Sequence, residues 1–113
     1  MGRFDTGAEE IFLRTSTSKR LKLDPTDYIT TDIIFGNGSS IATSLAAQLN
    51  SHLQAIIIPD EYLVADLIAA GPIINLGYDI HLSRDQSYIS EGDTKIMPIV
   101  RENNNFYVDI QRL

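Results

Sequence analysis

The chain of 113 residues contains no cysteine, which excludes disulfides, metal sites built on thiolates and a cysteine nucleophile. It also lacks any apolar run near the ~20 residues that a membrane-spanning helix needs. No charged-then-apolar leader precedes Asp5, so nothing in the sequence supports secretion. We therefore expect an intracellular protein without a membrane partner.

Positive charge is scarce as well, since the net charge is −6 and most basic residues are scattered. The one cluster, Lys19, Arg20 and Lys22, is more simply explained as a solvated loop than as a phosphate-binding patch. Nucleic-acid binding depends on a basic face or stripe, so we expect none by this domain alone. His52 and His81 are the only imidazoles and fall at outward positions of expected strands, so we predict no metal and no cofactor.

The sequence is rich in short strand-forming segments separated by turn residues. Residues 29–43 combine β-branched residues with Gly36-Asn37-Gly38, and Asn-Gly favours a hairpin because type I′ turns need positive φ at both central positions. Residues 52–58 end as an apolar run, which indicates a strand buried on both faces. Further along, we predict an alternating strand at residues 78–83, a turn at 90–94 and a strand at 95–100 that pairs with the strand before it. A second turn at 103–105 leads into a last strand at 106–110.

This pattern predicts a mainly β chain, folded as a small barrel or sandwich. One segment is ambiguous: residues 61–70 have helical propensity and a possible N-cap at Asp60. Gly71-Pro72 separates this segment from the next, so both cannot be long helices. We predict a strand or irregular segment up to Ala70 and one or two helical turns from Pro72 to Leu76, with Gly77 just past their end.

A short motif near the start, Asp5-Thr6-Gly7, has two interpretations. Asp-Thr-Gly is a good turn sequence and needs no function. It is also the sequence around the catalytic aspartate of aspartic proteases. By itself the tripeptide is a weak signal, because it arises often by chance at ordinary residue frequencies.

The order of motifs along the chain adds weight to the second interpretation. After "FDTGAEEIFL" come a glycine-rich hairpin, "IIFGNGSSI", an apolar strand, "AIIIP", and then "DLIAAGPIINLGYDI", with "RENNNFYVDI" closing the chain. This order resembles the retropepsins, and most closely the protease region of copia-type retrotransposon Pol polyproteins. The resemblance covers nearly the whole chain, although each motif is weak alone. The sequence departs from many retropepsins at Ala69, where they have glycine.

The resemblance implies a closed β-barrel of retropepsin type with a flap hairpin and one short helix. It implies one domain over residues 1–113, with 84–113 as a C-terminal β extension and with the N-terminal strand of retropepsins missing. Asp5 would be the catalytic carboxylate, Thr6 would hydrogen-bond across a dimer, and Gly7 would point its N–H at the aspartate. The flap that covers the peptide would consist of Phe35, Gly36, Asn37, Gly38 and Ser39.

The implied activity is that of an aspartic endopeptidase that processes a Gag-Pol-like polyprotein, in the cytoplasm or in virus-like particles. One Asp-Thr-Gly motif supplies one of the two carboxylates required, so the resemblance implies a homodimer acting on a polypeptide substrate. A second hypothesis stays open. The chain could instead be a non-catalytic barrel of the same ancestry, truncated or domesticated, that dimerises or binds another protein.

Overall fold

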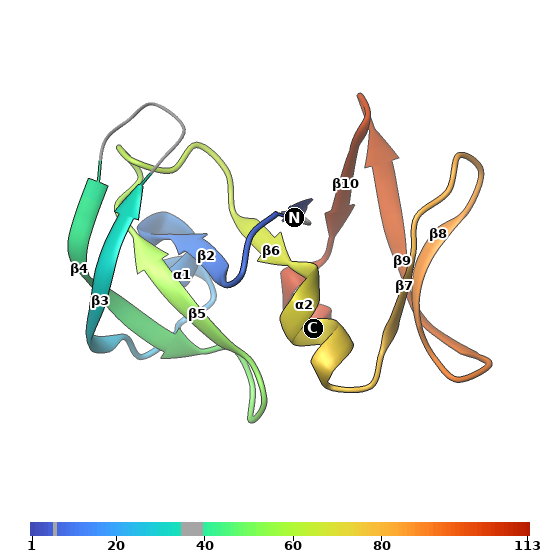
Figure 1. Cartoon of the computed structure of the whole chain (residues 1–113), viewed down its shortest axis with the longest axis horizontal. Helices are drawn as coiled ribbons and strands as arrows, with labels where there is room; N and C mark the ends of the chain where they lie inside the picture. The colour runs from blue at the N-terminus through green and yellow to red at the C-terminus, as the bar shows by residue number, and fades with distance from the viewer. Residues whose placement is uncertain (6, 35–39) are drawn as a thin grey trace. The chain divides into compact units, whose positions relative to one another are not determined.

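In the computed structural model of the chain, residues 1–5, 7–34 and 40–113 are described, with the backbone alone for 27–34 and 40–44. The described residues are mainly β, with few and short helices, which confirms the predicted class (Figure 1). The chain divides into two compact units. One is the continuous segment Ile11–Asp66, and the other combines Met1–Glu10 with Leu67–Leu113. We call them the central unit and the terminal unit.

The central unit is a sheet in the order β3-β4-β5-β2 with one helix, α1. Its elements are β2 (Ile11–Arg14), α1 (Thr15–Arg20), β3 (Thr26–Ile34), β4 (Ser40–Gln48) and β5 (Gln54–Ile58). The apolar strand β5 lies between an antiparallel neighbour, β4, and a parallel one, β2. Residues 55–58 of β5 are all buried, which confirms the strand predicted to be buried on both faces.

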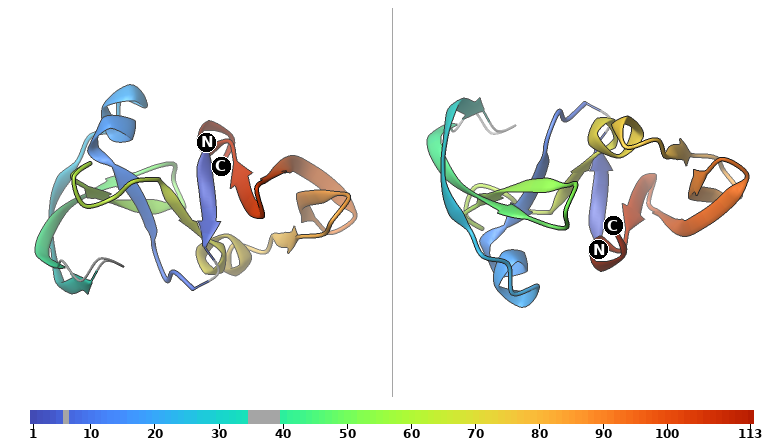
Figure 2. Two further views of the ribbon diagram at one scale, coloured as in Figure 1. Left: turned by 90° about the horizontal axis from the view of Figure 1, so that it is seen from above. Right: turned by 90° about the horizontal axis from the view of Figure 1, so that it is seen from below.

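The terminal unit has the strand order β6-β1-β10-β9-β8-β7. Its elements are β1 (Gly2–Asp5), β6 (Leu67–Ala69), α2 (Ala70–Asn75), β7 (Asp79–His81), β8 (Ser87–Glu91), β9 (Thr94–Glu102), β10 (Asn105–Val108) and the 3-10 turn η1 (Ile110–Arg112). Strand β1 pairs in parallel with β6 and antiparallel with β10. Both views of Figure 2 show β1, in blue, beside the red C-terminal strand β10.

Several local predictions are confirmed. The short helix expected at Pro72–Leu76 is α2, which begins two residues earlier. The turn at 103–105 is a two-residue hairpin loop, because Glu102 pairs with Asn105 while Asn103 and Asn104 have φ of 50° and 68°. Positive φ at both central positions is typical of a type I′ turn. Strands β3 and β4 form the antiparallel pair expected of a hairpin.

Other predictions need correction. Residues 95–100 belong to β9, which pairs with β8 and β10 and not with the strand at 79–81, because the unpredicted strand β8 lies between them. The turn expected at 90–94 narrows to Gly92-Asp93, since Glu91 already pairs with Thr94. Helix α1 was not predicted. Closure into a barrel is not confirmed, because the pairings recorded among the described residues of each unit form an open sheet.

Candidate functional site

Strand β1 leads into the Asp-Thr-Gly motif and ends at Asp5, so the residues of β1 lie on defined faces of the terminal unit's sheet. A Cβ on Gly2 would lie 2.5 Å from Ile68 Cγ1 and 3.0 Å from Ile110 Cγ1, so Gly2 faces the core. Successive residues of a strand point to opposite faces. Arg3 and Asp5 therefore share the face opposite to that of Gly2.

Asp5 ends β1 in a tight turn that its own carboxylate helps to hold. The Ala8 N–H donates to the Asp5 carbonyl at 3.2 Å, and the Gly7 N–H donates to Asp5 Oδ1 at 2.9 Å. A Cβ at position 7 would lie 3.4 Å from Oδ1, an ordinary van der Waals distance, so this hydrogen bond does not by itself require glycine. Asp5 is half-buried as a residue, and its carboxylate makes an exposed hydrogen bond with one backbone donor at the end of a sheet strand. Thr6 lies outside the described residues.

The apolar segment that the sequence places before the short helix lies alongside the motif. In the parallel pairing of β1 with β6, Phe4 is in register with Ile68 and Asp5 with Ala69. Ala69 is fully buried and α2 begins at the next residue. The structure therefore brings the motif together with β6 and the start of α2 in one unit, although more than sixty residues of sequence separate the motif from β6.

The predicted flap residues Phe35, Gly36, Asn37, Gly38 and Ser39 all lie outside the described residues. The flanking strands are described, and their last register pair is Ile34 with Ser40. Residues 35–39 thus connect two paired antiparallel strands. Their role as a flap stays a prediction.

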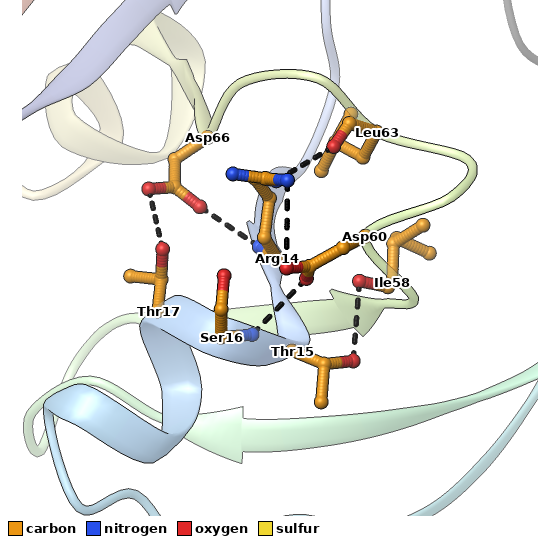
Figure 3. Close-up of polar contacts among 8 residues, drawn as sticks. All are labelled: Arg14, Thr15, Ser16, Thr17, Ile58, Asp60, Leu63 and Asp66. Atoms are coloured by element: carbon orange, nitrogen blue, oxygen red, sulfur yellow. Dashed lines mark hydrogen bonds and ion pairs between the residues drawn. The ribbon is translucent and has the colours of Figure 1, made fainter.

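A polar cluster that the sequence did not reveal lies in the central unit, where β2 passes into α1 (Figure 3). Asp66 is buried and accepts two hydrogen bonds at 2.8 Å, from the Arg14 N–H to Oδ1 and from the Thr17 hydroxyl to Oδ2. Arg14 Nε donates to the Leu63 carbonyl at 2.8 Å, and the Thr15 hydroxyl donates to the Ile58 carbonyl at 3.3 Å. These bonds attach the start of α1 to residues 58–66, so we interpret the cluster as structural.

Asp60 belongs to the same cluster and acts as a helix cap from a distant part of the chain. Its Oδ1 accepts from the Ser16 N–H at 3.1 Å, in the first turn of α1, and its Oδ2 lies 3.4 Å from Arg14 Nη2. Hydrogen bonds from the Ser16 side chain and backbone lower the pKa of Asp60, with smaller contributions from the charges of Arg14 and Lys19. The sequence predicted Asp60 as a possible cap of the segment that follows it. The structure shows it capping α1.

The two histidines belong to different units of the chain. His81 stacks on Tyr88 of the neighbouring strand with ring centroids 4.5 Å apart, and Lys95 Nζ lies 4.5 Å from the Tyr88 ring centroid. His52 is exposed in the connection before β5. Within the part of the chain that the structure describes, no group of three or more His, Cys, Asp or Glu side chains could hold a metal ion.

No helix among the described residues is long and apolar enough to span a membrane. Comparison of the chain with protein-family models, with curated proteins and with solved structures finds no match. What the site does is therefore inferred from the geometry around Asp5 and from the order of the motifs.

Proposed function

We propose that the chain is a retroelement-type aspartic endopeptidase that processes a Gag-Pol-like polyprotein as a homodimer. The observation that carries this proposal is the placement of Asp5. Asp5 ends strand β1, and its carboxylate accepts a hydrogen bond from the Gly7 N–H. Asp5 is also in register with Ala69 of β6, the strand that leads into α2. The resemblance implies a Gly7 N–H directed at Asp5, and this hydrogen bond supports the proposal.

The proposed chemistry needs two carboxylates that share one proton. The charged carboxylate activates a water molecule, and the protonated one donates to the carbonyl oxygen of the peptide. Two carboxylates a few Å apart cannot both ionise, which keeps the shared proton in place. Because the sequence contains one Asp-Thr-Gly motif, the second carboxylate would be the Asp5 of a second copy.

The remaining features of a retropepsin are part of the same proposal. Thr6 would hydrogen-bond across the twofold axis to hold the two catalytic loops, and residues 35–39 would form the flap that excludes water from the peptide. The strands would close into a barrel of retropepsin type. The antiparallel pairing of β3 with β4 supports the hairpin that such a flap requires.

One observation favours the alternative, a non-catalytic protein-binding or dimerisation module. The hydrogen bond from Gly7 to Asp5 spans only two residues and is exposed. Asn and Asp form such turns at many surface positions that have no catalytic role. The two hypotheses differ in what removal of the Asp5 carboxylate should do.

A peptidase assay with pepstatin and an Asp5→Asn variant tests the proposal. The substitution removes the ionisable group and keeps its size, so cleavage should be lost while the far-ultraviolet circular dichroism stays unchanged. The wild-type rate should be bell-shaped in pH, because one carboxylate must be charged and the other protonated.

The matched control is Asp85→Asn, since the Asp85 side chain is 86% exposed and pairs only with its neighbour Arg84 among the described residues. This variant should cleave at the wild-type rate. Full activity in Asp5→Asn would show that the motif is an ordinary turn and would support the binding module.

A further inference from the structure

Arg3 is the residue of β1 that shares a face with Asp5. Two residues along a strand correspond to about 6.6 Å, so the two side chains leave the same face one repeat apart. Both are half-buried, and both belong to the terminal unit. A cation thus lies directly beside the carboxylate proposed to be catalytic.

The register of the sheet defines what surrounds Arg3 on that face. Arg3 pairs with Leu67 of β6 on one side and with Tyr107 of β10 on the other. Directly opposed residues in a sheet have Cβ atoms about 5 Å apart and contact each other. Arg3 is therefore flanked on its face by Leu67 and Tyr107, an aliphatic and an aromatic residue that are both half-buried.

Arg3 forms no ion pair with an acid among the described residues. It takes part in none of their recorded side-chain hydrogen bonds, and the Asp5 carboxylate accepts only from the Gly7 N–H. Arginine presents a planar fork of donors that matches a carboxylate with two parallel hydrogen bonds. Because Arg3 is half-buried and not bonded to an acid among the described residues, its guanidinium is available for a carboxylate from outside the chain.

We propose that Arg3 determines specificity and selects polypeptides with an aspartate or glutamate at one of the two residues flanking the scissile bond. This inference rests on the proposed function. In a peptide bound with its scissile carbonyl at Asp5, the two residues that flank this bond are the ones closest to the Asp5 face of β1. Arg3, one strand repeat from Asp5, would meet a residue next to the cleaved bond.

The experiment compares matched substrates. A library of unbiased peptides first locates the cleavage sites that depend on Asp5, and one site is then made in two forms, with Glu or Gln beside the scissile bond. For the wild type we expect kcat/KM about 10- to 100-fold higher for the Glu peptide, the range expected for a charge-assisted pair. Arg3→Leu should bring the ratio to about one. Arg3→Lys, which keeps the charge but loses the fork, should give an intermediate ratio.

Arg84→Leu is the control, because Arg84 is exposed and pairs with Asp85, and it should keep the wild-type ratio. Equal cleavage of the two peptides by the wild type, or an unchanged ratio in Arg3→Leu, would overturn the role of Arg3 and leave the peptidase intact. Absence of any Asp5-dependent cleavage in the library would overturn both proposals. Circular dichroism of Arg3→Leu and Arg3→Lys separates loss of selectivity from loss of folding.

Discussion

At the scale of single residues, Asp66 has the clearest structural role in the chain. Asp66 is buried, and its carboxylate accepts hydrogen bonds from the backbone N–H of Arg14 and from the hydroxyl of Thr17. Both donors lie about fifty residues earlier in the sequence. Burying the Asp66 carboxylate costs little folding free energy while both donors are hydrogen-bonded to it. Its removal leaves two donors without partners, and unpaired buried polar groups are costly.

We predict that Asp66→Ala lowers the free energy of unfolding by about 2–4 kcal/mol, because one buried and one part-buried donor lose their acceptor. Chemical denaturation followed by circular dichroism measures the loss. Asp85→Ala, at an exposed position, should change stability by less than about 0.5 kcal/mol. If Asp66→Ala lowered the free energy of unfolding by no more than the control does, Asp66 would not have this structural role.

At the scale of elements, helix α1 depends on residues outside it. Its sequence, TSTSKR, is rich in Thr and Ser, which favour caps and turns over helix interiors. Its N-cap residue, Arg14, makes no side-chain capping bond. The carboxylate of Asp60 supplies that bond from the connection after β5, which explains why so short and unfavourable a sequence is helical at this place.

This capping predicts a pH dependence. The pKa of Asp60 in the folded chain is below its ordinary value of 3.8, because Ser16 donates to the carboxylate. The charged form therefore stabilises the fold fully above about pH 4, and this stabilisation is lost as the pH falls through the folded pKa. Asp60→Asn should be less stable than the wild type at pH 6, and the difference should shrink below pH 4.

Denaturation curves of both proteins between pH 3 and pH 7 provide the measurement. Other carboxylates titrate equally in the two proteins, so the difference isolates Asp60. A difference that stays constant or grows on acidification would rule out capping by the charged carboxylate.

At the scale of the whole molecule, the chain divides into a continuous central unit and a terminal unit assembled from both of its ends. The terminal unit contains Asp5, Arg3, Ala69 and the start of α2. It includes the one Asp-Thr-Gly motif of the sequence, so under the proposed function each chain supplies one catalytic aspartate. Activity would then belong to a pair of chains.

Mixing wild type with Asp5→Asn tests this dependence on a pair. If chains exchange freely and pair at random, adding an equal amount of the inactive variant leaves about half of the wild-type chains in wild-type dimers, so activity should fall to about half. An equal amount of an unrelated protein should have no effect. Activity unchanged by excess Asp5→Asn would show that single chains are active, and sedimentation of the mixture would report the oligomeric state directly.

Short-range features of this protein could be predicted from its sequence. The Asn103-Asn104 loop, the helix after Ala69 and the buried strand β5 each depend on residues close together in the chain. The N–H of Gly7 points at Asp5, as the motif implies, because a three-residue turn is held by its own atoms. Local propensity and periodicity are sufficient for such features.

Tertiary structure alone decided the features that join distant segments. Helix α1 is held by hydrogen bonds from Ser16 and Thr17 to the carboxylates of Asp60 and Asp66, which lie far along the sequence. The neighbours of Asp5 and Arg3 follow from the register of β1 with β6 and β10, more than sixty residues away. No local pattern encodes such a register, since it depends on which partner buries each strand's apolar face.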